Sequence, residues 1–329
     1  MNGRKNKSVP VSPVSGEQRV FHQVHLDVAR NATDDFNPFH DRDKWQRIPG
    51  NPFGGPIVLG FQLECLVEYL VTRLREREGY PAGGPGPAFR NYQFSFAGAL
   101  RPDVPFSVTV KPTVTRQDAA GSPMLSNRVA LRTADRLVLL GQVRDSQSPL
   151  ALADVPAPAV DLRTLQDRAL LPGGEWFHKR KFMLNSNAKN MIAGSLGNQA
   201  DYFDEIEDRV NFPDLFPVSL VSCALLEQAH ATGHDFYANP MVYTHHHISV
   251  DQRLARALRS NDALHLLVRA AEPPGTDAGG LGRAEVAQLR HECLGLLSGH
   301  RVLFRAEVLL APLAAIIGRP AVGGTGGPV

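Results

Sequence analysis

The sequence has few cysteines, little excess charge and no long apolar run. Its three cysteines, Cys65, Cys223 and Cys293, lie far apart without a Cys-x-x-Cys pair, which excludes a zinc ribbon and argues against a disulfide framework. The 35 Lys and Arg residues against 33 Asp and Glu residues give a formal net charge of +2. A dedicated nucleic-acid-binding protein usually carries a larger basic excess. No window reaches the roughly 18 consecutive apolar residues of a membrane span.

Several functional motifs are also absent. No Gly-x-Gly-x-x-Gly follows a strand, and the chain has neither a phosphate-binding P-loop nor a Gly-x-Ser-x-Gly nucleophile elbow. Nucleotide-dependent and serine-hydrolase functions therefore lack support. The first 17 residues are polar and hold no apolar core of a secretory signal, so we expect a cytoplasmic protein.

Length and local composition predict two domains. At roughly 150 residues per domain, 329 residues suggest two, and a Pro-rich stretch near the middle marks the linker between them. Both ends have little to bury, and 272–280 is expected to be a surface loop. The predicted organisation is a tail (1–17), a first domain (18–144), a linker (145–174), a second domain (175–317) and a C-terminal tail (318–329).

The first domain is expected to be of the α+β class. Residues 58–78 form an apolar helical pattern ended by Gly79 and Pro81, and a helix apolar nearly all round is a buried one. Four strand-like segments follow it: 89–96, 106–115, 126–133 and 137–143. One buried helix followed by antiparallel strands indicates a sheet wrapped on a helix.

The second domain repeats this plan. When residues 21–60 are compared without gaps with 182–221, a shift of 161 positions, seven residues are identical. The pairs are Phe21/Phe182, Ala32/Ala193, Asn37/Asn198, Asp43/Asp204, Pro52/Pro213, Pro56/Pro217 and Leu59/Leu220. Both copies then continue with an apolar helix, 218–230 in the second, and strand-like segments, here at 241–250 and 264–270. We interpret the chain as a duplicated domain.

The sharpest local feature is the segment Asp35-Phe36-Asn37-Pro38-Phe39-His40. An Asn-Pro pair favours a tight turn, which can present the Asp35 carboxylate and the His40 imidazole side by side. Such a pair can activate a water molecule, one group acting as base and the other as proton relay. The alternative is an Asx-turn with a histidine cap and no chemistry.

A Gly/Pro-rich segment, 51–60, leads into the buried helix. Backbone N–H groups at a helix N-terminus suit a partially negative oxygen, and Gly60 would let a carbonyl approach the backbone closely. Together with Asp35 and His40, this segment would provide water activation and an oxyanion site. A loop that merely starts a core helix is the alternative.

Together, the two segments resemble the MaoC-like (R)-specific enoyl-CoA hydratase and 3-hydroxyacyl-thioester dehydratase family. Its pattern is Ser/Thr-Gly-Asp-x-Asn-Pro-x-His, followed by Phe-Gly-x-Pro-Ile-x-His-Gly, against residues 33–40 and 53–60 here. The resemblance implies a double hotdog, in which two antiparallel sheets each wrap around a long central helix. It also implies an acyl-CoA or acyl-carrier-protein thioester substrate, with neither a metal nor a redox cofactor. Assembly as a homodimer of such subunits stays open.

The resemblance also implies site residues. Asp35 and His40 match the acid/base pair, and the N–H of Gly60 matches the group that binds the thioester carbonyl. The residues implied to bind substrate or shape the loops are Asn37, Pro38, Gly55, Pro56 and Leu59.

The chain departs from the family pattern at two positions of the first copy. Asp34 replaces a glycine, which places a second carboxylate beside Asp35, and Leu59 replaces a histidine. In the second copy Leu196, Asp201 and Val221 stand opposite Asp35, His40 and Gly60. The second copy is therefore expected to complete the pseudo-dimer and shape the acyl pocket rather than to form a second active site.

Two other polar runs invite functional interpretations. The run 245–247 is His-His-His, but alternate residues of a strand face opposite sides, so we favour a strand, packed or lining the cleft between the halves, over a metal site. The basic run 178–181 could meet a phosphate of the substrate carrier, or form a solvated strand edge.

The function predicted from the sequence is reversible hydration of a 2-enoyl thioester to a 3-hydroxyacyl thioester. One alternative is a non-catalytic thioester-binding protein. The other is a hotdog enzyme that hydrolyses, cyclises or isomerises an acyl thioester, because hotdog folds host several reactions.

Overall fold

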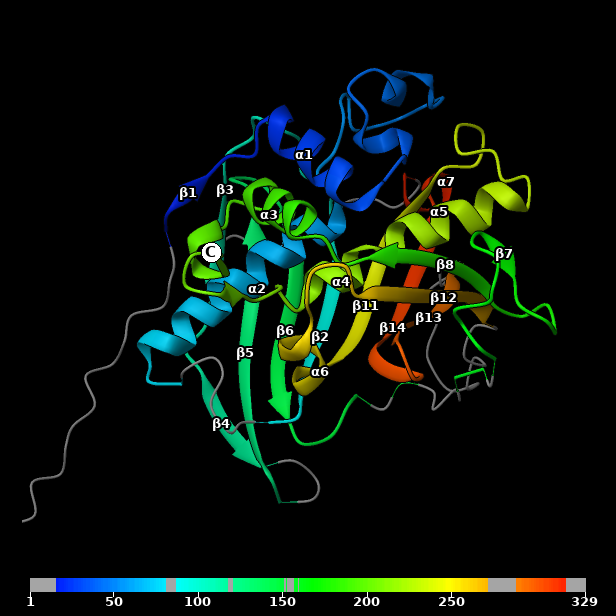
Figure 1. Ribbon diagram of the computed structural model, residues 1–329. Coiled ribbons are helices and arrows are strands. Elements are labelled where there is room, and N and C mark those ends of the chain that lie inside the picture. Colours follow the sequence, from blue (N-terminus) through cyan, green and yellow to red (C-terminus); the bar gives the residue numbers. More distant parts are fainter. Residues whose placement is uncertain are drawn as a thin grey trace, which may run out of the picture.

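A computed structural model describes residues 16–80, 87–117, 121–150, 152, 157–158, 160–271 and 288–317 (Figure 1). Most of the predicted tails and the predicted loop at 272–280 lie outside these residues. Within them, no helix is long and apolar enough to cross a membrane.

The first half is built around the helix α2, Gly60–Arg77, which confirms the predicted buried helix. Twelve of its 18 residues are buried, as its nearly all-round apolar pattern requires. The other elements of this half are β1 (Gln18–Arg19), α1 (Gln23–Thr33), η1 (Pro38–His40), η2 (Lys44–Arg47), β2 (Phe89–Phe96), β3 (Phe106–Val110), β4 (Val114–Gln117), β5 (Pro123–Arg132) and β6 (Leu137–Ser146).

The second half has the same plan, with its central helix broken into α4, Leu215–Ser219, and α5, Val221–Ala231. The predicted helix and strands of this half are confirmed. Its other elements are β7 (Ala169–Leu170), β8 (Phe177–Phe182), α3 (Asn185–Gly194), η3 (Gln199–Asp201), β9 (Phe203–Asp204), β10 (Arg209–Val210), β11 (Met241–Asp251), α6 (Gln252–Ala257), β12 (Ala263–Ala271), β13 (Leu289–Leu297), β14 (Arg301–Pro312) and α7 (Leu313–Ile317).

The sheets of the two halves join edge to edge. β2 pairs antiparallel with β11, from His245 opposite Ser95 to Asp251 opposite Phe89, so that twelve strands form one continuous sheet. Figure 1 shows α2 crossing the first half of this sheet and α5 the second half. The predicted fold, an antiparallel sheet wrapped around a central helix in each half, is confirmed, and the β2–β11 ladder makes the two sheets continuous.

Strand order and turn geometry show the internal duplication directly. Outward from the junction the order is β2-β6-β5-β3-β1 in the first half and β11-β14-β13-β12-β8-β7 in the second. The short helices η1 and η3 lie 161 positions apart. Asn37 caps η1 by accepting from the N–H of Phe39, and Asn198 caps η3 by accepting from that of Ala200. The shift of 161 positions therefore superposes equivalent structural elements.

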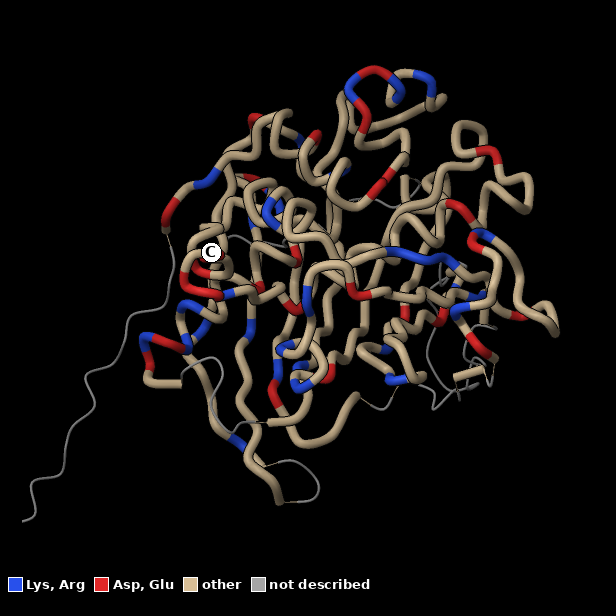
Figure 2. The backbone as a smooth tube through the Cα atoms, viewed as in Figure 1, with Lys and Arg blue, Asp and Glu red and all other residues tan. Residues whose placement is uncertain are grey.

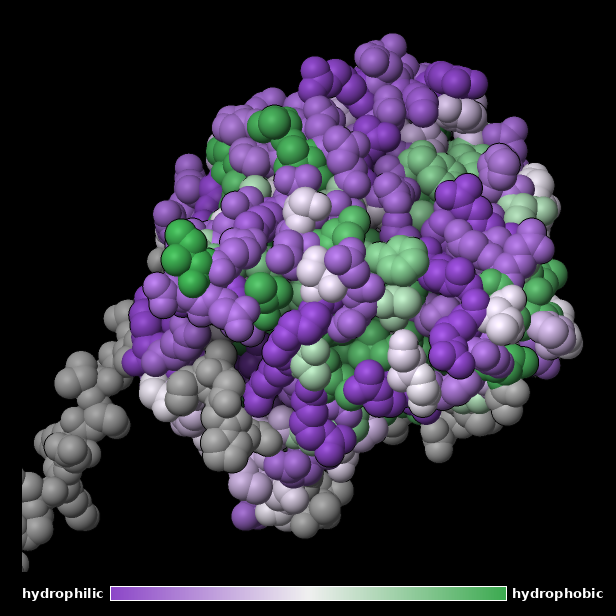
Figure 3. Space-filling view, in the orientation of Figure 1, coloured by the Kyte–Doolittle hydropathy of each residue, from purple (hydrophilic) through white to green (hydrophobic). Residues whose placement is uncertain are grey.

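One large core runs through both halves, and a smaller one lies on the opposite face of the second sheet. Successive side chains of a strand face opposite sides, so Leu266 of β12 joins the large core and Leu267 the smaller one. Leu162 and Leu171, from the segment predicted as a linker, cover Leu267 in the smaller core. Figure 3 shows only small separate hydrophobic groups on the face in view.

A buried charge network connects the two halves. Asp145 accepts two hydrogen bonds from Arg90, both 2.9 Å, and pairs with Arg75 at 2.8 Å. Arg90 also lies 3.3 Å from Asp214 of the second half. Burial raises the pKa of Asp145, but the arginine charges outweigh burial and hold that pKa at about 2.

Glu68 of α2 extends this network as a largely protonated carboxyl group. Its oxygens accept from the backbone N–H groups of Asp214, at 2.7 Å, and Leu215, at 2.9 Å, which lie just before and at the start of α4. Burial and then the Asp214 charge raise the pKa of Glu68 to about 8. The first central helix therefore holds the start of the second through two hydrogen bonds from backbone N–H groups to the Glu68 carboxyl group.

We predict that Asp145→Asn lowers the free energy of unfolding by about 3–5 kcal/mol, because it leaves two buried arginines short of one negative charge. Urea unfolding at pH 7 measures the change. Asp161→Asn, a substitution at an exposed aspartate, is the control and should leave the midpoint nearly unchanged. Equal midpoints for the two variants would contradict the importance of the network.

Candidate active site

The helix α1 ends in the turn that carries the predicted site. Its C-cap residue, Asp34, has φ +54° and ψ +36°, the left-handed conformation in which aspartate is tolerated better than most non-glycine residues. This backbone geometry explains why the family pattern has glycine here. The Asp34 carboxylate is mostly exposed and pairs with Lys181 of β8. Asp34 is therefore held by the second half of the chain and is not a second buried acid beside Asp35.

The Asp35 carboxylate is buried and engaged at both oxygens. Oδ1 accepts from the N–H of Asn37 at 2.8 Å, which is the Asx-turn considered as the alternative from sequence. Oδ2 accepts from the hydroxyl of Ser222 on α5 at 2.6 Å, and Ser222 Oγ in turn accepts from the Tyr243 hydroxyl at 3.1 Å. A hydrogen-bonded series therefore runs from Tyr243 on β11 through Ser222 to Asp35.

The His40 imidazole is fixed in one tautomer by its surroundings. Nδ1 lies 2.8 Å from the carbonyl oxygen of Ile57, and a carbonyl oxygen can only accept, so Nδ1 carries the hydrogen. Neutral His40 therefore has its lone pair on Nε2, available as a proton acceptor. Burial lowers the pKa of His40, and the nearby Asp35 charge partly opposes that effect. At pH 7 His40 is consequently neutral.

Gly60 is the first residue of α2, so its N–H has no acceptor within the helix. A β-carbon at Gly60 would lie 3.1 Å from the Phe96 ring and 3.2 Å from the Tyr243 ring. Any larger residue would displace these aromatic walls. The preceding Leu59 is buried in the core, which explains how a leucine is accommodated where the family pattern has histidine.

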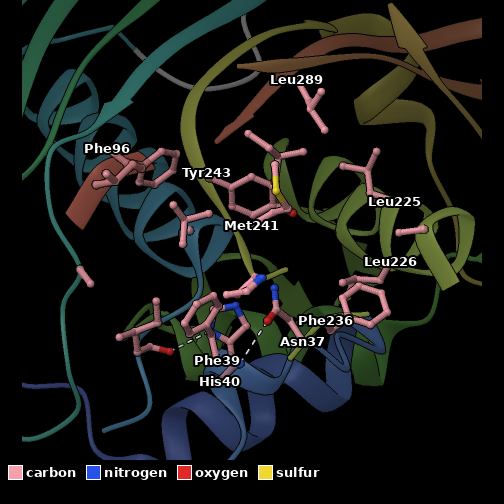
Figure 4. A pocket seen from close by; sticks show the side chains of 18 of the residues that line it. Asn37, Phe39, His40, Phe96, Leu225, Leu226, Phe236, Met241, Tyr243 and Leu289 are labelled. Carbon is pink, nitrogen blue, oxygen red and sulfur yellow. Dashed lines mark hydrogen bonds between the residues drawn. The ribbon is translucent and has the colours of Figure 1, made fainter. Parts of the chain in front are cut away.

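A cavity of about 410 Å³ lies between the two halves. Figure 4 shows Asn37, Phe39 and His40 at one end and Leu289 at the other, with Met241 and Tyr243 between them. Its lining includes Asn37, His40, Val58, Gly60 and Phe96 from the first half and Leu225, Leu226, Phe236, Met241, Tyr243, His291 and Leu310 from the second. A small polar end and a long apolar remainder characterise this cavity.

The structure brings together some of the predicted site residues and separates others. His40, Gly60 and Asn37 line the cavity. Asp35 does not line the cavity. Hydrogen bonds connect it through Ser222 to Tyr243, which does line the cavity. The remaining predicted residues support the site from outside the lining: Pro38 is buried in η1, Gly55 and Pro56 lie in the loop before α2, and Leu59 packs in the core.

The second copy has no equivalent polar site among the described residues. Leu196 adopts the left-handed conformation, with φ +58°, near the end of α3. Asp201 accepts from the Tyr69 hydroxyl at 3.0 Å, and Val221 is buried at the start of α5. None of the three lines the cavity.

The basic run 178–181 lies along β8 and is matched by partners inside the protein (Figure 2). Lys179 pairs with Asp167 and Glu227, and Lys181 pairs with Asp34. Arg180 donates to backbone carbonyl groups, the shortest contact being 2.7 Å to Leu165. His178 lies 3.0 Å from His265. These contacts favour a structural role for the run over phosphate binding.

The three consecutive histidines of β11 alternate between two faces of the strand, and the His245 and His247 rings lie 6.5 Å apart. His246 is fully buried and lies 2.7 Å from Glu64 of α2, and the Tyr243, Phe61 and Phe96 rings surround it. His247 lies 3.2 Å from Glu307. The alternation supports a packed strand beside the cavity, as expected for β structure.

Sequence reasoning missed Ser222 and Tyr243. Ser222 follows Val221, the counterpart of Gly60, so the repeat alignment placed it at the start of the second central helix. The repeat alignment did not show that this helix start faces the turn that carries Asp35 in the first half. Tyr243 lies two residues before the histidine run that drew attention to the strand.

We predict that the imidazole pKa of His40 lies below 6.5, the ordinary value for histidine, because burial disfavours the charged ring. Asp35→Asn should lower that pKa further, since it removes the negative charge that partly stabilises the imidazolium. NMR titration of protein labelled at histidine, with His40→Gln to assign the signal, measures both values. A pKa above 6.5, or an upward change in Asp35→Asn, would contradict this electrostatic description.

No family model matches the chain, and no curated protein matches it. Solved structures do. A putative MaoC domain protein dehydratase from Chloroflexus aurantiacus J-10-fl superposes with a TM-score of 0.58 at 11% identity, over 94% of this chain and 99% of that one. A MaoC-like dehydratase gives 0.55 at 11%, over 91% and 97%. A Mycobacterium tuberculosis protein described as having a double hotdog fold gives 0.52 at 14%, over 90% and 94%. The chain thus has the double hotdog fold and resembles MaoC-like dehydratases in architecture.

Proposed function

We propose that the protein is a hydro-lyase that reversibly adds water to a 2-enoyl thioester. The observation that carries the proposal is one cavity lined by both a neutral histidine, His40, and Gly60, whose N–H at the start of α2 has no acceptor within the helix. A proton acceptor and an oxyanion donor on one cavity are what conjugate addition of water to a thioester requires. The fold of MaoC-like dehydratases supports the same chemistry by analogy.

In the hydration direction, Nε2 of His40 takes a proton from water as the water oxygen bonds to the β-carbon. The negative charge that moves to the thioester oxygen is stabilised by the N–H of Gly60. The imidazolium then gives a proton to the α-carbon, so one water molecule is added in total. Asp35 stabilises the positive charge of His40 during this cycle, and Ser222 holds the carboxylate in place.

The apolar remainder of the cavity would receive the acyl chain. Leu225 and Leu226 of α5, Met241 of β11 and Leu289 of β13 provide hydrocarbon walls. At about 410 Å³ the cavity falls within the range typical of small-molecule sites. We therefore propose that the second half supplies the acyl pocket and that the carrier is CoA or an acyl carrier protein.

We predict that the protein consumes trans-2-enoyl-CoAs, with the preferred chain length reporting the depth of the pocket. His40→Gln and Asp35→Asn should each lower kcat/KM by about 100-fold or more, because general acid–base catalysis typically contributes that much. Loss of the conjugated enoyl absorbance, measured with short, medium and long chains, follows the reaction. Near-normal turnover by His40→Gln would contradict the proposed role of the imidazole.

Thioester binding without turnover is a second candidate, favoured by the position of Asp35 behind the cavity wall. It predicts that an enoyl-CoA binds but its absorbance does not change. Hydrolysis is distinguished from hydration by a thiol reagent, because only hydrolysis releases free CoA.

Ser222→Ala tests whether the hydrogen bond from the second half to the Asp35 carboxylate matters for catalysis. Removing the hydroxyl leaves one oxygen of a buried carboxylate without its donor, which costs about 1.5–3 kcal/mol. We predict that kcat falls about 10- to 100-fold with little change in KM. Ser219→Ala, which removes a buried hydroxyl bonded to the backbone of α4, is the matched control. Equal kcat values for the two variants would contradict the role of Ser222.

A further inference from the structure

A second, smaller cavity adjoins the main one. Its volume is about 240 Å³, and its lining consists of Pro52, Phe53, Ala99, Arg101 and Arg136. Phe53 and Ala99 also line the main cavity, so these two residues form the junction that borders both cavities. The main cavity is mostly apolar, whereas two guanidinium groups dominate the second.

The Arg101 side chain lies along the loop that leads to Gly60. A β-carbon at Gly54 would be 3.5 Å from Nη1 of Arg101, and one at Gly55 would be 3.6 Å from its Cδ. Gly54 has φ +63°, which favours glycine. Both distances correspond to ordinary contact, so the Arg101 side chain packs against the segment that leads to Gly60.

The Arg136 side chain approaches from the connection between β5 and β6. Its Cδ lies 4.0 Å from the position of a β-carbon on Gly98, and Gly98 itself lines the main cavity. Arg101 and Arg136 thus flank the junction of the two cavities from different segments of the first half.

Neither guanidinium has a carboxylate partner within ion-pair distance among the residues that the structure describes. Asp103, two residues from Arg101, pairs with His22 at 2.6 Å. Asp135, beside Arg136, accepts from the Thr133 hydroxyl at 2.6 Å, and this bond, with a smaller effect of the Arg136 charge, lowers the pKa of Asp135. Arg75 and Arg90, by contrast, share Asp145. Two guanidinium groups that line one small cavity have the charge and the donors to bind an anion.

We propose that Arg101 and Arg136 bind a phosphate group on the carrier arm of the thioester substrate. This inference rests on the proposed function, which puts the thioester carbonyl at Gly60 and the acyl chain between α5 and β13. The carrier arm must then leave the main cavity on another side, and the shared lining residues Phe53 and Ala99 place the two arginines next to that cavity. CoA and phosphopantetheine on a carrier protein both carry a phosphate on this arm, and guanidinium groups bind phosphate in a bidentate manner.

The test compares enoyl thioesters of one acyl chain on four carriers: pantetheine, 4′-phosphopantetheine, CoA and an acyl carrier protein. Wild type, the double variant Arg101→Gln/Arg136→Gln and the control Arg116→Gln are assayed. Arg116 is exposed on β4 and lines neither cavity. We expect wild type and the control to prefer 4′-phosphopantetheine over pantetheine at least tenfold in kcat/KM, mainly through KM. The double variant should lose this preference, so that its kcat/KM becomes similar for the 4′-phosphopantetheine and pantetheine thioesters.

The outcomes separate this inference from the proposed function. If wild type hydrates the pantetheine thioester and the double variant retains the phosphate preference, the arginine site is overturned while the hydratase proposal stands. If wild type hydrates none of the thioesters, the hydratase proposal fails, and calorimetric binding of free CoA to wild type and the double variant still tests the arginines; equal affinities overturn the site. A further gain with CoA over 4′-phosphopantetheine identifies CoA as the source of the phosphate, whereas a gain only with the carrier-protein thioester identifies the protein carrier.

Discussion

The pairing of β2 with β11 is the interaction on which the arrangement of the site depends. Seven consecutive residue pairs, from His245–Ser95 to Asp251–Phe89, join two half-sheets into one. The strand orders of the two halves mirror each other about this ladder, and the start of α5 meets the turn after α1 through the Ser222–Asp35 hydrogen bond. A shift of this ladder by one residue would reverse the faces of β11, moving Tyr243 out of the cavity and His246 away from Glu64.

The two halves share one plan but differ in the residues that they provide to the cavity. The first half keeps the polar turn and the glycine at the helix start, while the second has Leu196, Asp201 and Val221 in those places. The second half has no polar site of this kind among its described residues. It provides leucines that line the apolar cavity and the Ser222 hydroxyl that donates to the Asp35 carboxylate. The buried network of Arg75, Arg90, Asp145, Asp214 and Glu68 holds the halves together away from the cavity.

Much of the fold could be predicted because its signals are local. The apolar pattern of α2, the strand composition of β2 and the Asn-Pro turn each depend on residues close in sequence. The shift of 161 positions extended the prediction to the second half. The structure adds the tautomer of His40, which is set by the carbonyl oxygen of Ile57 in the second motif segment.

The rest of the site depends on contacts that no local pattern encodes. Ser222 and Asp35 are 187 positions apart, and only the mirrored sheet places them together. Likewise, the charge of the basic run 178–181 suggested phosphate binding, but Lys181 reaches Asp34 across 147 positions. Arg101 and Arg136, which have no carboxylate within ion-pair distance in the described part of the chain, lie outside any basic run of the sequence. Composition identifies charges, whereas the fold decides which of them are neutralised.

Product analysis of a reaction run in D₂O tests the central claim most directly. A trans-2-enoyl-CoA is incubated with the protein, and the product is examined by mass spectrometry and NMR. The account predicts an intact thioester with a hydroxyl group on the β-carbon and one deuterium on the α-carbon, absent with His40→Gln. Release of free CoA, or deuterium exchange without hydroxyl addition, would contradict hydration at this site.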